Sequence, residues 1–272
     1  MKERKVGLAL GGGSARGLAH IGVLKVLEKE GIPINMITGT SVGAVIGALY
    51  AQGKDASIIE DLALHLTQKR LFSLMDLTLP RTGFIRGEKI KGLLEMIIGG
   101  NAKFSDLRIP FACVATDIMT GDEVVINQGS VLDGVRASIS LPGILTLAIW
   151  GDRHLVDGGL VDPVPVDVLK EMGADFIIAV NVIPDIHARI HITDKDKAGK
   201  IKEPNIIGVI VQSIYIATYS LARASLEGAD VAIQPQVAHI GPTNFGQARE
   251  CIELGEAAAK ASMPDIKRKL EA

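Results

Sequence analysis

The chain has 272 residues, of which 47% are hydrophobic, and carries a formal net charge of −2 at pH 7. We expect a single domain over residues 1–272, with a sizeable core, because no Pro/Ser-rich linker or charged block divides the chain. The charge balance argues against a nucleic-acid partner, and the wide separation of Cys113 and Cys251 argues against a disulfide or metal framework and for a reducing compartment.

The first half of the chain opens with strands and helices in turn. Gly11-Gly12-Gly13 interrupts the first apolar run too early for a secretory signal, so that run is predicted to be a strand. A glycine-rich turn, a helix, a second strand, a tight turn and a second helix follow, which predicts parallel strands with a right-handed crossover. These strands and helices are expected over residues 5–10, 18–29 and 34–38, and from Ala44 onward.

The remainder continues to alternate, which predicts an α/β layered fold. Further helices are predicted over residues 56–69, 87–98, 132–138 and 164–172, in an apolar stretch that includes 206–222, and at the C-terminus. Further strands are predicted over residues 111–116, 123–127, 144–150, 154–156, 175–182 and 231–233. Residues 206–222 include Gln212 and Thr218, so they are expected to form a buried helix and not a membrane span. Residues 184–204 are polar and charged, which is typical of a mobile loop.

Ser41 lies on the predicted turn between the second strand and the second helix. It is flanked by glycines in Gly39-Thr40-Ser41-Val42-Gly43, the pattern of a nucleophile elbow. The turn is so tight that side chains at the flanking positions would collide, which explains glycines there. Ser41 is therefore a candidate nucleophile, and the alternative is a glycine-rich turn with an incidental serine.

The glycine cluster after the first strand, Gly11 to Gly17, has two functional interpretations. A dinucleotide site would require glycine where Arg16 stands, and an acid at the end of the second strand, which is absent. The favoured interpretation is an oxyanion hole, because glycines at a helix start leave main-chain N–H groups unobstructed. The alternative is a strand–helix turn that needs glycine for packing. Arg16 is expected to brace this loop, with binding of a substrate anion as the alternative.

Asp157 closes a predicted strand before Gly158-Gly159 and is the candidate general base for Ser41. Apolar neighbours such as Leu155 and Val156 would raise its pKa and make it a better base. The alternative is a structural turn, which is common for Asp before Gly. A small-residue stretch, residues 136–143, is expected either to line the pocket, placing a serine near the nucleophile, or to be a structural turn.

Histidine offers a competing base. A triad in the order serine, acid, histidine would need a histidine after Asp157, and His239 is the less favoured candidate. His187 and His191 have a metal-like spacing with nearby acids, but their polar context favours a solvated loop. His20 and His65 lie on predicted helices and are expected to be structural.

Taken together, four motifs resemble the patatin-like phospholipase family, in its single-domain bacterial form: the Gly11–Gly17 loop, the Ser41 elbow, Ser140-Leu141-Pro142-Gly143, and Asp157-Gly158-Gly159. The resemblance implies an α/β fold with a mostly parallel central sheet and helices on both faces. It further implies a Ser–Asp dyad without histidine, metal or cofactor. The implied residues are Ser41 and Asp157 for catalysis, Gly11, Gly12, Gly13 and Ser14 for the oxyanion hole, and Arg16, Gly17, Gly39, Gly43, Gly158 and Gly159 for support.

Two departures from the family pattern concern the loop, where an extra residue precedes Gly17, and the acid motif, which ends in Gly159 where many members have alanine. The first puts the donor set of the oxyanion hole in question.

We expect a cytoplasmic carboxylic-ester hydrolase that cleaves lysophospholipids or other fatty acyl esters through an acyl-enzyme, with transient contact to a membrane surface. Residues 71–85, apolar without a clean period, are a candidate lip for acyl chains or ordinary core. The alternatives are a regulatory protein of the same fold with little turnover and a nucleotide-binding α/β protein.

Overall fold

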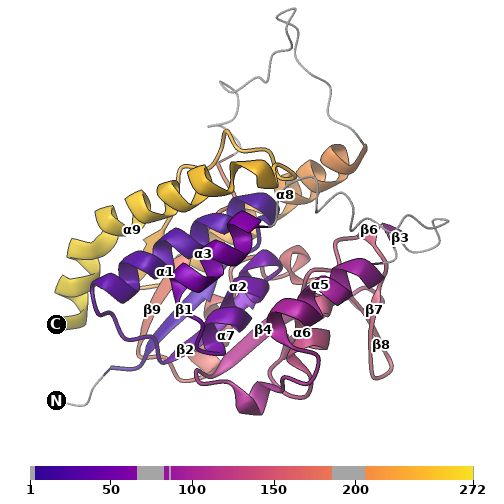
Figure 1. The fold of residues 1–272 in the computed structure, drawn as a ribbon, viewed down its shortest axis with the longest axis horizontal. Coiled ribbons are helices and arrows are strands. Elements are labelled where there is room, and N and C mark those ends of the chain that lie inside the picture. Colours follow the sequence, from indigo (N-terminus) through magenta and orange to yellow (C-terminus); the bar gives the residue numbers. More distant parts are fainter. Residues whose placement is uncertain (1–3, 66–82, 86, 186–205, 272) are drawn as a thin grey trace, which may run out of the picture.

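The computed structural model describes residues 4–65, 83–85, 87–185 and 206–271. The strands of its main sheet are β1 (Val6–Leu10), β2 (Met36–Thr40), β4 (Phe111–Asp117), β5 (Glu123–Ile126), β7 (Ala148–Trp150), β8 (Arg153–Asp157), β9 (Phe176–Val180) and β10 (Val231–Ile233). In this described part, the sheet runs β10-β9-β1-β2-β4-β8-β7, and β5 also pairs with β4 (Figure 1). A small second sheet pairs β3 (Gly83–Ile85) with β6 (Gly143–Leu145).

The centre of the main sheet is parallel. Strands β10, β9, β1, β2 and β4 are parallel to one another, whereas β5 and β8 pair with β4, and β7 with β8, in antiparallel fashion. The register pairs Leu10 of β1 with Gly39 of β2, so both strands end at the same edge of the sheet. The glycine-rich loop and the Ser41 turn therefore leave the sheet side by side, at the edge where α/β proteins bind ligands.

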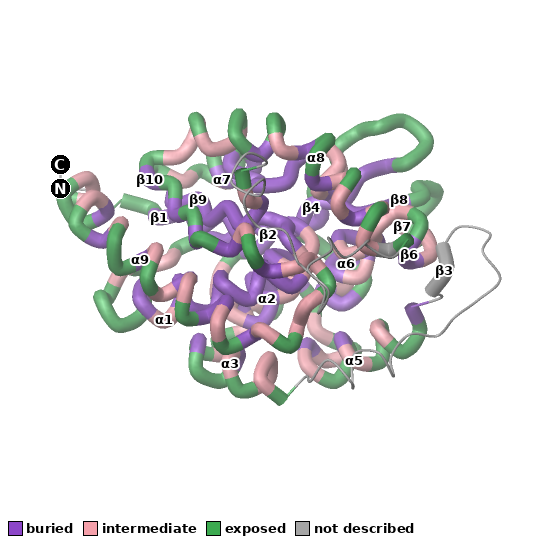
Figure 2. Tube along the Cα trace, turned by 90° about the horizontal axis from the view of Figure 1, so that it is seen from above, coloured by how far each residue is buried: buried purple, intermediate pink, exposed green. Residues whose placement is uncertain are grey.

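Helices cover both faces of this sheet, which confirms the expected layered α/β fold. The helices are α1 (Ala19–Lys29), α2 (Val42–Ala51), α3 (Ala56–His65), α5 (Glu88–Ile98), α6 (Val131–Ser138), α7 (Val166–Glu171), α8 (Ile206–Leu226) and α9 (Ala248–Glu271). Figure 2 shows α7 and α8 on one side of the strands and α1, α2, α3 and α5 on the other. Among the described residues, the apolar residues of both layers are buried in two large cores and a third, small cluster of Ala112, Val114 and Val168.

Strand β9 shows how one sequence supplies both cores. Phe176, Ile178 and Val180 belong to the core beneath α1 and α9, while Ile177 and Ala179 belong to the core beneath α7 and α8. Successive side chains of a strand point to opposite faces, so a strand buried on both sides must be apolar throughout. This explains the uninterrupted apolar run that predicted β9.

Helices α1 and α9 pack with their backbones in close approach. A Cβ atom at Gly22 of α1 would lie 1.9 Å from the carbonyl oxygen of Ile252, and one at Gly255 of α9 would lie 1.9 Å from that of Ala19. Any larger residue at either position would force the helices apart. The C-terminal helix is thereby held against the helix that follows the glycine-rich loop.

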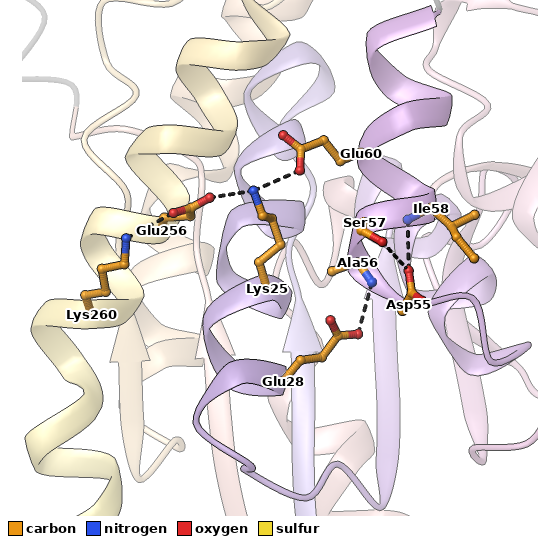
Figure 3. A network of polar contacts seen from close by, with 9 residues as sticks. All are labelled: Lys25, Glu28, Asp55, Ala56, Ser57, Ile58, Glu60, Glu256 and Lys260. Carbon is orange, nitrogen blue, oxygen red and sulfur yellow. Dashed lines mark hydrogen bonds and ion pairs between the residues drawn. The ribbon is translucent and has the colours of Figure 1, made fainter.

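Charged side chains tie α1, α3 and α9 together on the outer surface (Figure 3). Lys25 lies 2.8 Å from Glu60 of α3 and 2.7 Å from Glu256 of α9, and both partners raise the pKa of its ammonium group. Glu28 accepts the main-chain N–H of Ala56 at 3.0 Å, at the start of α3. Lys25 is central to this network because it bridges two carboxylates that would otherwise repel each other.

The structure differs from the sequence-based expectation in three places. Strand β2 covers Met36–Thr40 and not residues 34–38, because Asn35 bonds to Val6 through both its main chain and its side chain before the ladder begins. The strand expected over 144–150 is two strands in different sheets, β6 and β7. Helix α8 is buried on one side only, and Ile206, Val209 and Ile216 are exposed.

Among the described helices, none has the length and hydropathy that a membrane span requires. The proposed lip at residues 71–85 lies outside the described residues except for β3. The same holds for most of the expected loop at 184–204, including His187 and His191.

Candidate active site

Ser41 occupies a strained turn between β2 and α2. Its backbone angles are φ 55° and ψ −123°, in a region that non-glycine residues rarely adopt and that costs about 1–3 kcal/mol. The flanking glycines make the turn sterically feasible. A Cβ atom at Gly39 would lie 2.6 Å from the carbonyl oxygen of Gly43, and one at Gly43 would lie 2.1 Å from that of Leu10. The side chain of Ser41 is therefore presented at the carboxyl edge of the sheet.

Asp157 meets Ser41 from the end of β8. The Ser41 hydroxyl lies 2.6 Å from Oδ2 of Asp157, and Oδ1 accepts the main-chain N–H of Gly159 at 2.8 Å. Thr116 of β4 donates to the main-chain oxygen of Asp157 at 2.9 Å. Gly158 must be glycine, because a Cβ atom there would lie 2.3 Å from the carbonyl oxygen of Val114. The carboxylate is thus held by Ser41 and Gly159, and the main chain around it is held against β4.

The environment of Asp157 changes its acidity. Burial raises the pKa of its carboxyl to about 6, and hydrogen bonds from Ser41 and from the N–H of Gly159 oppose that rise. The side chain is only 3% exposed, so loss of solvent dominates. At neutral pH the group is still ionised, and it is a stronger base than an exposed aspartate.

Two main-chain N–H groups of the glycine-rich loop already donate hydrogen bonds within the protein. The N–H of Gly11 donates to Val180 at 3.0 Å, and that of Gly12 donates to Pro163 at 2.9 Å. Neither amide is free to bind an oxyanion, which corrects the expectation that Gly11 and Gly12 supply donors. For Gly13 and Ser14, the described part of the chain contains no acceptor bonded to either amide.

Packing explains the residue types at the end of this loop. A Cβ atom at Gly13 would lie 2.4 Å from Cγ2 of Val182, and one at Gly17 would lie 2.1 Å from Cγ1 of Val42. Ser14 has φ 52°, so both serines near the site, Ser14 and Ser41, have positive φ. The loop continues as a 3₁₀ helix over Ser14–Leu18 that leads into α1.

Arg16 is fully buried within this 3₁₀ helix. Its Nε donates to the carbonyl oxygen of Ile240 at 2.7 Å, and its guanidinium lies 5.5 Å from the centre of the Tyr215 ring. These contacts are with the protein itself, as the bracing interpretation predicts. They connect the glycine-rich loop to the segment before α9 and to α8.

The small-residue stretch at 136–143 holds both members of the pair. The main-chain N–H of Ser41 donates to Oγ of Ser138 at 2.9 Å, and that of Asp157 donates to the main-chain oxygen of Ser140 at 2.9 Å. The sequence suggested a serine near the nucleophile but not which one. The amide of Ser41 is consequently not a free donor for an oxyanion.

A small pocket opens onto Ser41 and Asp157. Gly12, Gly13 and Gly159 form part of its wall, and the rest is largely apolar: Leu141, Pro163, Ile183, Ile214, Tyr215 and Thr218. The last three come from α8, more than 170 positions after Ser41 in the chain. The apolar pattern of α8 is equally typical of a core helix, so the sequence does not indicate that this helix lines the site.

The histidines take other roles. Nε2 of His239 lies 2.7 Å from Oε1 of Glu250 near the surface, and among the described residues no histidine lines the pocket. His65 contacts the carbonyl oxygen of Asp61 in its own helix. His20 is buried beneath the glycine-rich loop, with Nε2 2.7 Å from the carbonyl oxygen of Gly11.

Comparison with known proteins gives consistent results. The family model described as patatin-like phospholipase matches residues 8–170. The chain is 32% identical to an uncharacterized NTE family protein of Mycobacterium tuberculosis, over 97% of this chain and 48% of that protein. It is 38% identical to the lysophospholipase NTE1 of Debaryomyces hansenii, over 67% of this chain and 12% of that protein. The chain thus spans about half the length of the mycobacterial relatives it matches.

Among solved structures, VipD from Legionella pneumophila has a similar fold, with a TM-score of 0.54 and 13% identity. That match covers 95% of this chain and 66% of VipD. At this identity the similarity concerns the fold alone, and it supports the layered arrangement described above.

Proposed function

This chain belongs to the patatin-like phospholipase family, and on that basis we propose that it is a serine lipid acyl hydrolase with Ser41 as nucleophile and Asp157 as general base. The observation that carries the proposal is the 2.6 Å contact between the Ser41 hydroxyl and the Asp157 carboxylate, at a strained turn beside a glycine-rich loop. Strain at a turn that presents a serine is typical of catalytic sites.

In the first half of the reaction, Asp157 accepts the proton of the Ser41 hydroxyl as Oγ forms a bond to the ester carbonyl carbon. The carbonyl electron pair moves to oxygen, and the amides of Gly13 and Ser14 stabilise the negative charge. Collapse of this intermediate breaks the bond to the alcohol oxygen, which takes the proton from Asp157. In the second half, Asp157 takes a proton from the water that attacks the acyl carbon, the bond from that carbon to Oγ breaks, and Asp157 returns the proton to Oγ of Ser41 as the fatty acid leaves.

The pocket wall supports a proposal for the substrate class. Apolar side chains from α8 and from Leu141 and Ile183 face the pair, and such a wall is suited to an acyl chain. We therefore propose lysophospholipids or other fatty acyl esters as substrates. Val209 and Ile216 of the same helix are exposed, and we propose that the side of α8 that carries them makes transient contact with a membrane surface.

We also propose that residues 1–272 form one catalytic domain. Arg16 of the glycine-rich loop bonds to Ile240, and Cys251 of α9 lies 3.6 Å from the carbonyl oxygen of Ala15. The C-terminal helix therefore supports the loop that contributes to the site.

A fluorophosphonate probe, combined with a panel of acyl esters of different chain lengths, tests the proposal. We expect covalent labelling at Ser41 and hydrolysis by the wild-type protein, and loss of both in Ser41→Ala. Asp157→Asn should lose hydrolysis while keeping its fold by circular dichroism. Full hydrolysis by Asp157→Asn would reject the dyad, and a wild-type protein that neither labels nor hydrolyses any ester would favour a regulatory protein of the same fold.

A further inference from the structure

His20 is a buried histidine whose ring touches the glycine-rich loop. It lies in the first turn of α1, is 0% exposed, and places Nε2 2.7 Å from the carbonyl oxygen of Gly11. A carbonyl oxygen only accepts hydrogen bonds, so Nε2 must carry the hydrogen. Burial lowers the pKa of the ring to about 4, which keeps it neutral under ordinary conditions.

The other ring nitrogen of His20 makes no hydrogen bond within the described part of the protein. With the hydrogen on Nε2, Nδ1 is an acceptor, and it is buried without a hydrogen-bond partner among the described residues. A buried polar atom without a partner destabilises the folded state. The bond from Nε2 to the Gly11 carbonyl offsets this cost, so the effect of that bond on the loop is what the imidazole provides.

The bond from His20 fixes a particular peptide unit. The carbonyl oxygen of Gly11 is held by His20, and the N–H of the same peptide, which belongs to Gly12, is held by Pro163 at 2.9 Å. The preceding N–H, that of Gly11, is held by Val180. Three consecutive glycines have a wide choice of backbone angles, so without such bonds this segment would populate several orientations. The direction of the next amides, Gly13 and Ser14, depends on this peptide.

We propose that His20 is a positioning residue for the oxyanion hole. Its neutral imidazole holds the Gly11 carbonyl and thereby keeps the Gly13 and Ser14 amides directed toward the ester oxygen at Ser41. The inference rests on the proposed hydrolase function. Donors that are fixed before the reaction stabilise the developing charge without reorganisation, so the contribution falls on the transition state and not on substrate binding.

The test compares three variants in the full chain. His20→Leu removes the donor and also the unpartnered nitrogen. His20→Gln keeps an N–H that can reach the Gly11 carbonyl. His65→Gln is the control, because His65 also bonds to a main-chain carbonyl but lies on α3 and does not line the pocket.

For His20→Leu we expect kcat to fall at least about tenfold with KM within about twofold, since loss of one oxyanion donor typically costs more than that. His20→Gln should recover most of the loss, and His65→Gln should match the wild type. The affinity for a trifluoromethyl ketone, whose adduct with Ser41 carries the oxyanion, should fall in parallel with kcat/KM. A non-reactive ether analogue should bind all variants equally. His20→Leu should also lower the melting temperature, because the Gly11 carbonyl loses its buried donor, and His20→Gln should lower it less.

Wild-type kcat in a folded His20→Leu would overturn the inference, as would equal losses in the Leu and Gln variants. If the variants do not fold, ¹⁵N NMR of the wild-type imidazole decides: a ring charged at pH 7, or one with its hydrogen on Nδ1, excludes the proposed bond. Failure of the hydrolase proposal is a separate result, because then the wild-type protein itself neither labels nor turns over.

Discussion

The Ser41 hydroxyl and the Asp157 carboxylate lie 2.6 Å apart, although the two residues are 116 positions apart in the chain. Ser41 follows β2 and Asp157 ends β8, and β4 lies between these strands in the sheet. The two side chains meet across the end of β4, because the turn that carries Ser41 projects beyond the edge of the sheet. Bonds from Gly159 to the Asp157 carboxylate, and from the main-chain N–H of Asp157 to Ser140, hold Asp157 in place. The chemistry of this pair depends on the ionisation of Asp157.

The pH dependence of hydrolysis should report that ionisation. Burial raises the pKa of Asp157 to about 6, and only the ionised form accepts the Ser41 proton. We expect kcat/KM to rise with pH through about 6, to level off above it, and to be lost progressively below it. A pH–rate profile with a non-ionisable ester measures this. A profile that stays flat from pH 8 to pH 5 would contradict the assignment of Asp157 as base.

The same shift predicts that Asp157 lowers the stability of the fold at neutral pH. Because the folded pKa of about 6 exceeds the ordinary aspartate pKa of 3.8, the folded state binds the proton more tightly than the unfolded state does. Stability from this group is therefore gained as pH falls from 6 toward 4, and above pH 6 the buried charge costs about 3 kcal/mol. Asp157→Asn should be more stable than the wild type at pH 8, with the difference shrinking toward pH 4.

Urea unfolding of both proteins at pH 8 and pH 5 checks this expectation. Ser41→Ala serves as the control, since it removes the hydroxyl but leaves the buried carboxylate. If Asp157→Asn proves less stable at pH 8, the carboxylate contributes more through its hydrogen bonds than it costs through burial.

Gly13 should tolerate no side chain unless Val182 is shortened. A Cβ atom at Gly13 would lie 2.4 Å from Cγ2 of Val182, but 3.4 Å or more from the atoms that remain after Val182→Ala. We expect Gly13→Ala to lower kcat/KM at least about tenfold by displacing an oxyanion donor. The double variant should recover part of this loss, while Val182→Ala alone should cost mainly stability, about 1–2 kcal/mol. No recovery in the double variant would show that the clash is not the cause.

Ser138 should hold the nucleophile in place. Its hydroxyl accepts the main-chain N–H of Ser41, so Ser138→Ala leaves that N–H without its partner, at a cost of about 1–3 kcal/mol in the free energy of unfolding. We expect kcat to fall as the strained turn relaxes. Ser140→Ala is the matched control, because it also removes a buried hydroxyl, here one bonded to Arg136, but retains the main-chain oxygen that accepts from Asp157. Equal kcat in both variants would argue against a role for Ser138.

The exposed side of α8 should matter for substrates in a bilayer. Val209 and Ile216 are 44% and 51% exposed, and no charged residue occurs between Ile206 and Leu221. The double variant Val209→Gln/Ile216→Gln should hydrolyse a lysophospholipid in vesicles more slowly, yet keep its rate on a short water-soluble ester. Ile58→Gln, at an exposed apolar residue of α3, controls for general surface effects. A parallel loss on both substrates would indicate damage to the site and not to surface contact.

Much of the architecture was accessible from local patterns. The apolar periodicity predicted nearly every helix and strand to within a few residues, because backbone periodicity and glycine turns depend on near neighbours. The motifs around Ser41 and Asp157 resembled the patatin-like phospholipase family, and the model of that family matches residues 8–170. Periodicity, glycine turns and short motifs involve residues that are near each other in the chain, so they can be recognised without knowing which segments pack together.

The remaining features depend on partners that are distant in the chain. The main-chain N–H groups of Gly11 and Gly12 donate to the carbonyl oxygens of Val180 and Pro163, which no spacing in the sequence predicts. The proposed donors of the oxyanion hole are therefore the amides of Gly13 and Ser14. The wall from α8 and the Ser138 bond arise in the same way. Main-chain donors carry no residue-specific signal, so which acceptor each one finds emerges when the strands and helices are packed together.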